Sequence, residues 1–116
     1  MGLTREFKET VMKRAQEDSA FREGLLTEAL ECFIAGEVAT GKLLLRDYIN
    51  ATIGFQALSK MMRKKDSSLK RMLGPTGNPA ANSLFAITKL LQHREGIEFK
   101  VVTQRAKRHG KSRAAQ

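Results

Sequence analysis

The sequence has one cysteine, no tryptophan and no long uninterrupted run of apolar residues. Cys32 has no second cysteine to pair with, which excludes an intrachain disulfide, and its apolar neighbours predict a small buried core residue. No apolar run approaches the roughly 18 residues of a membrane-spanning helix, and the N-terminus lacks a signal peptide's hydrophobic segment. The chain is therefore expected to be cytoplasmic.

Recognisable arrangements of catalytic, metal-binding or nucleotide-binding residues are also missing. His93 and His109 are not spaced as metal ligands with each other or with Cys32. The glycine-containing loop at 74–77 lacks the spacing and the lysine of a P-loop. No serine or cysteine pairs with a histidine and an acid in a local pattern, although triads need not be local. We therefore expect no cofactor and no enzyme activity.

The net charge of +9 is concentrated in two segments of the chain. Residues 55–77 carry 6 basic groups and 1 acid, a net +5, and residues 104–116 carry 5 basic groups and no acid. Residues 1–54, in contrast, carry 7 basic and 9 acidic groups, a net −2. Basic segments attract polyanions, of which DNA and RNA are the common ones and an anionic membrane is another. We expect a nucleic acid partner and no membrane partner.

Apolar residues recur at helical spacing along most of the chain and predict a single all-α domain of five to six helices over residues 1–103. The expected helices cover 5–16, 19–35, 38–51, 55–62, 67–73 and a last one that starts at 79 and includes 84–91. The residues expected to cap helices are Thr4, Asp18, Asp66 and Asn78, the last with Pro79 at the first helical position. Gly36 stands where a left-handed residue would end the second helix.

The period of the apolar residues changes after Gly96. Apolar residues then alternate with charged ones, which predicts a short C-terminal β-strand over 97–103. A strand needs a partner, and the chain has no other evident strand, so the simplest partner is the same strand of a second copy in a homodimer. Residues 104–116 are basic, with alanine as their only aliphatic residue, and are expected to be a disordered tail.

The strongest functional signal lies at 55–73, where a turn without apolar residues joins two short helices. If Leu69, Met72 and Leu73 point inward, the second helix presents a polar edge that suits the major groove of duplex DNA. The residues expected to read base edges are Ser67, Ser68, Lys70 and Arg71. The residues expected to contact phosphates are Lys60, Lys64, Lys65, Thr76 and Asn78. The alternative interpretation is an ordinary helical hairpin with a solvated basic face.

Four stretches of the chain match a known pattern: LLRDYINATIGF at 44–55, SLKRMLGPTGNP at 68–79, LFAITKLL at 84–91 and IEFKVV at 97–102. With these stretches the chain resembles the helix-turn-helix antitoxins of bacterial toxin–antitoxin modules, the addiction-module antidote family. These antitoxins are relatives of phage-repressor-type DNA-binding domains. The resemblance covers about half the chain, and LGPTGNP after a short amphipathic helix is its most specific part.

The resemblance implies a phage-repressor-like domain that dimerises and binds a promoter, often that of its own operon. It also implies a toxin partner for many members. The chain departs from the family pattern at the turn, where Arg63 replaces the usual glycine and would be strained if the backbone is left-handed. It also departs in residues 1–36, an N-terminal extension that would pack against the core, a second subunit or a toxin.

Three functional hypotheses follow. The first is a dimeric, sequence-specific repressor that reads a palindromic operator through Ser67–Arg71. The second is an antitoxin that acts mainly by neutralising a cognate toxin through residues 1–36. The third is nonspecific nucleic acid binding through the basic tail, although few aromatic residues are available to stack on single-stranded bases.

Overall fold

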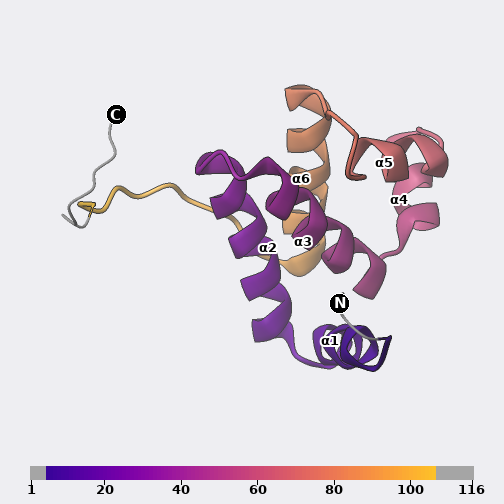
Figure 1. Ribbon diagram of the computed structural model, residues 1–116, viewed down its shortest axis with the longest axis horizontal. Helices are drawn as coiled ribbons and strands as arrows, with labels where there is room; N and C mark the ends of the chain where they lie inside the picture. The colour runs from indigo at the N-terminus through magenta and orange to yellow at the C-terminus, as the bar shows by residue number, and fades with distance from the viewer. Residues whose placement is uncertain (1–4, 107–116) are drawn as a thin grey trace.

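The computed structural model describes residues 5–106, which contain six α-helices and no β-strand (Figure 1). The helices are α1 (Arg5–Glu17), α2 (Ser19–Ile34), α3 (Val38–Ala51), α4 (Phe55–Met62), α5 (Asp66–Met72) and α6 (Ala81–Glu95). The expected all-α fold is confirmed, and every helix starts within two residues of its expected first residue. The expected cap Thr4 and most of the expected disordered tail, 107–116, lie outside the described residues.

Two of the expected helix-end signals are confirmed. The Asp18 carboxylate accepts a hydrogen bond from the backbone N–H of Phe21 at 3.2 Å, so Asp18 caps α2. Gly36 has φ +85°, the left-handed conformation expected after the end of α2. The backbone N–H of Glu37 then donates to the carbonyl of Cys32, which satisfies a carbonyl that the ending helix leaves open.

Two expected caps are wrong. Asp66 is the first residue of α5, with Lys65 before it as the cap position, and its carboxylate is paired with Lys70 at 3.9 Å. Asn78 and Pro79 precede α6, which begins at Ala81 without a side-chain cap. Local cap preferences are weak signals, and helix boundaries are the least reliable part of a sequence-based prediction.

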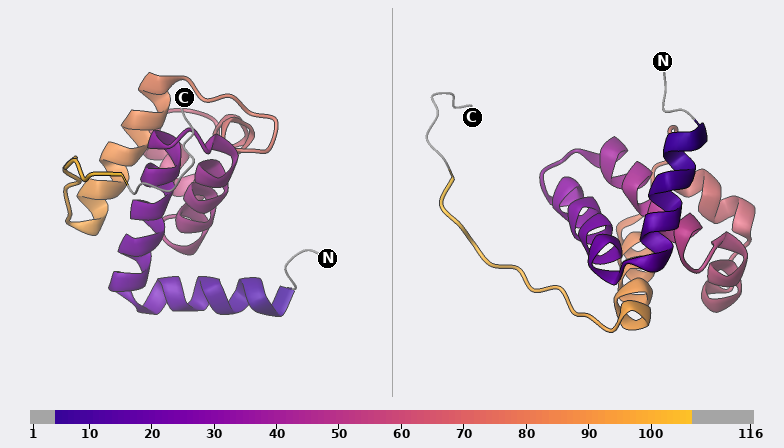
Figure 2. Two further views of the ribbon diagram at one scale, coloured as in Figure 1. Left: turned by 60° about the vertical axis from the view of Figure 1, so that its left-hand side comes forward. Right: turned by 90° about the horizontal axis from the view of Figure 1, so that it is seen from below.

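All helices from α2 to α6 contribute to one hydrophobic core. Its buried members are Leu26, Ala29, Leu45, Tyr48, Ile49, Phe55, Leu58, Leu69, Leu73, Ile87 and Leu91. Cys32 is also buried, as the sequence predicts. Because α2 supplies Leu26 and Ala29, the N-terminal extension packs against the core of its own chain. Helix α1 runs across the end of α2 (Figure 2) and buries Ala15.

Helices α2 and α3 approach each other closely at Gly41. A Cβ atom on Gly41 would lie 2.8 Å from the Phe33 ring, so a larger residue there would require this ring to move. The close packing of the two helices offsets the low helix propensity of glycine in the first turn of α3.

A polar cluster joins α2, α3 and α6 on the side of the molecule near α1. The Arg22 guanidinium donates to both carboxylate oxygens of Glu95 at 3.0 to 3.1 Å and to the carbonyl of Ala15 at 3.1 Å. The Tyr48 hydroxyl also donates to Glu95. Burial alone would raise the pKa of Glu95, but the hydrogen bonds from Arg22 and Tyr48 outweigh it and hold this pKa below its usual value. The cluster therefore ties the N-terminal extension to α6 through an ionised carboxylate.

The segment after α6, residues 97–106, has no regular secondary structure. Residues 99–102 line a groove with α2, and the chain then extends away from the helices (Figures 1 and 2). The strand expected over 97–103 is therefore not confirmed. A strand requires a hydrogen-bonded neighbour, and none of residues 5–106 supplies one. Phe99 packs against the core, and its backbone N–H donates to Gln92 Oε1 at 2.8 Å. Beyond it, Val101 and Val102 are 84% and 82% exposed.

We expect Arg22→Met to lower the free energy of unfolding by about 2–4 kcal/mol at pH 7, because it leaves a largely buried carboxylate without its cationic partner. A lowered carboxylate pKa stabilises the fold above the ordinary glutamate pKa of about 4.3, and this stabilisation is lost as the pH falls through the lower folded-state value. The difference from wild type should therefore shrink in acid. Urea titrations at several pH values measure it.

The matched control is Arg14→Met, which removes an exposed arginine paired with Asp18. It should cost less than about 1 kcal/mol, because exposed ion pairs contribute little. Equal losses for the two variants would contradict a structural role for the buried cluster.

Candidate functional site

Helices α4 and α5 form a short helix pair joined by the turn Arg63-Lys64-Lys65. Arg63 has φ 57° and ψ 42°, the left-handed conformation, and it is the only non-glycine residue with positive φ in the described chain. The backbone N–H of Lys64 donates to the carbonyl of Ser59 at 3.1 Å and closes the end of α4. Of the two possibilities for this turn, a left-handed Arg63 or a wider turn, the left-handed backbone is the one observed, and it leads the chain into α5.

The apolar edge of α5 is buried and its polar edge is exposed. Leu69 and Leu73 have no solvent exposure, and Met72 packs against the core. Of the residues expected to read bases, Ser67, Lys70 and Arg71 are exposed and Ser68 is half-buried. The orientation that the sequence predicts for this helix is therefore observed. The charges of α5 also complement its helix dipole, with the acidic Asp66 in the first turn and the basic Lys70 and Arg71 in the last turn.

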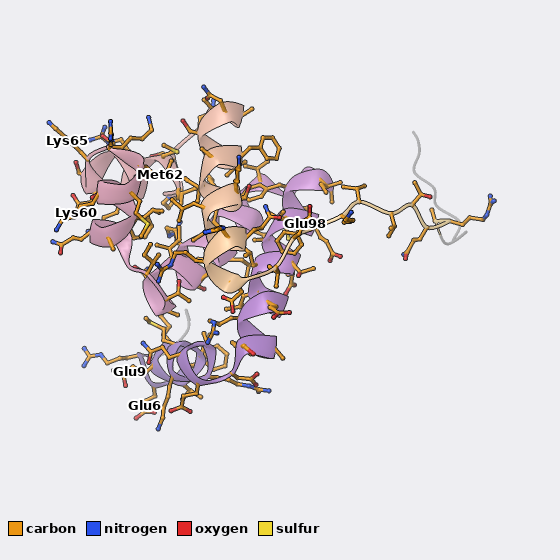
Figure 3. The ribbon with its side chains drawn as sticks, turned by 180° about the vertical axis from the view of Figure 1, so that it is seen from behind. Glu6, Glu9, Lys60, Met62, Lys65 and Glu98 are labelled. Carbon is orange, nitrogen blue, oxygen red and sulfur yellow. The ribbon has the colours of Figure 1, made fainter. Side chains whose placement is uncertain are left out.

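The five residues expected to contact phosphates are all exposed. They are Lys60, Lys64, Lys65, Thr76 and Asn78. In Figure 3, Lys60 and Lys65 extend outward at the end of the molecule formed by α4 and α5, whereas Glu6 and Glu9 lie on α1 at another end.

A groove lies beside α5, between it and the chain that leads into α6. Its lining residues are Ser68, Arg71, Met72, Thr76, Gly77, Asn78, Pro79, Ala80 and Ser83. Two of the expected base-reading residues, Ser68 and Arg71, therefore share one groove with Thr76 and Asn78. Lys60, Lys64 and Lys65 do not line it.

The loop that forms the far side of this groove is fastened to α3 by two basic side chains. Lys42, only 5% exposed, donates through Nζ to the carbonyls of Gly74 at 2.9 Å and Gly77 at 2.7 Å. Arg46, one helical turn later, donates through Nη1 to the carbonyl of Leu73 at 2.6 Å. These carbonyls follow the end of α5, where the helix itself supplies no donors.

Sequence reasoning did not single out Lys42 and Arg46. A usable signal exists for Lys42, which stands three residues before Leu45 and seven before Ile49, on the apolar face of α3. A charged residue on that face is rarely buried without partners. No sequence pattern identifies its partners, because the loop carbonyls belong to residues more than thirty positions away.

Comparison with protein-family models, with curated proteins and with solved structures found no match to this chain. No helix among residues 5–106 is long and apolar enough to cross a membrane. Within the same residues, no group of three or more histidine, cysteine, aspartate or glutamate side chains could hold a metal ion.

Arg63→Gly should raise the free energy of unfolding by roughly 0.5–1 kcal/mol, because glycine adopts the left-handed conformation without the steric cost that a Cβ imposes. Chemical denaturation of both proteins measures the difference. The matched control is Lys64→Gly in the same turn, where φ is not positive. This control should be neutral or destabilising. If both substitutions destabilise the fold equally, Arg63 carries no strain.

Proposed function

We propose that this protein is a dimeric, sequence-specific DNA-binding transcriptional regulator that represses its own operon. In this proposal α4 and α5 form a helix-turn-helix of the phage-repressor type, and α5 enters the major groove. The observation that carries the proposal is the division of α5 into a buried apolar edge and an exposed edge of serine, lysine and arginine.

The side chains on that edge have the chemistry that base reading requires. Arg71 and Lys70 can donate to the acceptors of guanine, and the serines can donate or accept. Lys70 is held by Asp66 at 3.9 Å, an exposed pair that DNA can displace at little cost. Arg71 has no ion pair within residues 5–106, so its guanidinium is available to a base.

The lysines around the turn have a different role. Lys64 and Lys65 are exposed and make no ion pair within the described part of the chain. Contacts of lysine with phosphate release counterions and strengthen binding to any duplex, whereas contacts with base edges distinguish one sequence from another. Substitutions at the two kinds of position should therefore have different signatures.

Arg71→Ala should weaken binding to the protein's own upstream DNA by about 1–3 kcal/mol and relax the preference at one base position. Lys65→Ala should weaken binding to that DNA and to a random duplex alike, and should reduce the slope of log affinity against log salt by about 1. Titrations of both duplexes at matched salt provide the measurement.

Several results would contradict this assignment. Equal losses on both duplexes for both variants would mean that Arg71 reads no base. A wild-type protein that binds both duplexes equally would exclude sequence-specific binding. A chain cut after Val102 should keep its sequence preference, whereas loss of all binding would make the basic tail the binding element.

Dimerisation is part of the proposal, and the segment after α6 is its proposed interface. The exposed Val101 and Val102 and the alternating apolar pattern of 97–101 support pairing of the 97–103 segments of two copies in a β-ribbon. Such pairing would satisfy the backbone groups of the segment and cover its valines. Two-fold symmetry then predicts a palindromic site with half-sites roughly 34–36 Å apart.

Val101→Asp should convert the dimer into a monomer without changing the helix content, because it places like charges in the paired segment. Sedimentation equilibrium and far-ultraviolet circular dichroism measure the two properties. The matched control is Gln104→Asp, which adds the same charge just beyond the expected strand and should leave the dimer intact. A wild-type protein that is monomeric at about 100 µM, well above a typical micromolar dissociation constant, would contradict the interface.

A further inference from the structure

We infer that Lys42 and Arg46 are positioning residues for DNA recognition, because they hold the loop 73–78 against α3 and so fix one side of the groove next to α5. The inference rests on the proposed function, since it concerns the same site. Neither residue was expected from the sequence to take part in binding, and neither lies on the exposed edge of α5.

The first argument is the position of the Lys42 ammonium. The residue is 5% exposed, has no acidic partner among residues 5–106, and has the carbonyls of Gly74 and Gly77 as its hydrogen-bond acceptors. A buried ammonium without such acceptors is strongly disfavoured. The closed loop and the buried lysine therefore require each other, and opening the loop would leave the charge without its acceptors.

The second argument is the site that the two cations occupy. The carbonyls of Leu73 and Gly74 follow the last turn of α5, where carbonyl groups lack intrahelical donors and the helix dipole is negative. Arg46 and Lys42 therefore act as a C-terminal cap supplied by another helix. This cap fixes the end of α5 as well as the loop.

The third argument is the close contact at Gly77. Its backbone N–H donates to the carbonyl of Gly74 at 3.0 Å, which forms a tight turn. A Cβ atom at this position would collide with the carbonyl oxygens of Arg71 and Met72. Because those are backbone atoms, the loop has no alternative path with a side chain at 77. The loop is thus held from both sides, by cations from α3 and by the backbone of α5.

The consequence for the site is that the side chains on α5 and those on the loop keep a fixed distance and orientation across the groove. Ser68 and Arg71 lie on α5, and Thr76 and Asn78 lie on the loop across the groove. The backbone N–H groups and the side chains of Thr76 and Asn78 have no hydrogen-bond partner within residues 5–106. Held in place, they form a preorganised set of donors for a phosphate while Arg71 reaches a base.

The experiment measures the loop without DNA and then the binding of DNA. In the ¹⁵N-labelled full chain, backbone order parameters at Gly74, Thr76, Gly77 and Asn78 should be near 0.85 and should fall below about 0.6 in Lys42→Met. Arg46→Met should loosen the same residues, and Arg46→Lys, which keeps a donor, should restore them. The matched control is Lys13→Met, an exposed lysine on α1, which should change none of them.

The binding measurement separates positioning from simple stability. Lys42→Met should bind the upstream duplex about tenfold more weakly, the effect of one lost directional contact. Its affinity for a random duplex should fall less, because the lysine contacts around the turn remain, whereas a loosened end of α5 no longer holds Arg71 against its base. Circular dichroism establishes that the variant is folded. If Lys42→Met does not fold, the order parameters and the DNA affinities are measured on Arg46→Met instead.

The outcomes for the two proposals are distinguishable. Loop order parameters in Lys42→Met and Arg46→Met that equal those of Lys13→Met would overturn the inference, whatever the DNA result. Equal losses on both duplexes, with a loosened loop, would also overturn it, because the two cations would then support phosphate contacts alone and not the reading of bases. A wild-type protein without sequence preference would refute the proposed function alone, and the order parameters would still decide whether the two cations hold the loop.

Discussion

The burial of Leu69 and Leu73 is the interaction on which the rest of the site depends. Helix α5 has only seven residues, too few to be stable alone, so its place is determined by tertiary packing. Once these two leucines are in the core, the helix can rotate very little about its axis, and the serine, lysine and arginine side chains must point outward. The same anchoring sets the position from which the loop 73–78 starts.

The N-terminal extension is part of this packing rather than an appendage. Helix α2 supplies core residues, Gly41 lets α3 lie close against Phe33, and Arg22 binds Glu95 at the far end of α6. Helix α3 is therefore held against α2 on one side and against the loop after α5 on the other.

The helices could be predicted from the sequence because their apolar periodicity is a local property. The strain at Arg63 could be anticipated only as a condition, because it depends on a left-handed backbone that the family resemblance suggests and the sequence alone does not determine. The expected caps Asp66 and Asn78 were wrong because cap preferences are weak local signals. Lys42 was missed because its partners are distant loop carbonyls. The strand expected at 97–103 is not observed, because alternating apolar residues predict a strand only where a hydrogen-bonded neighbour exists, and residues 5–106 supply none.

The direction in which the chain leaves α6 has a geometric consequence. Residues 97–106 depart on the side of the molecule away from α4 and α5 (Figure 1). In a dimer joined through this arm, the length of the arm would set the distance between the two α5 helices. Operator spacing would then evolve by insertions or deletions near Gly96, without any change to the residues that face the bases.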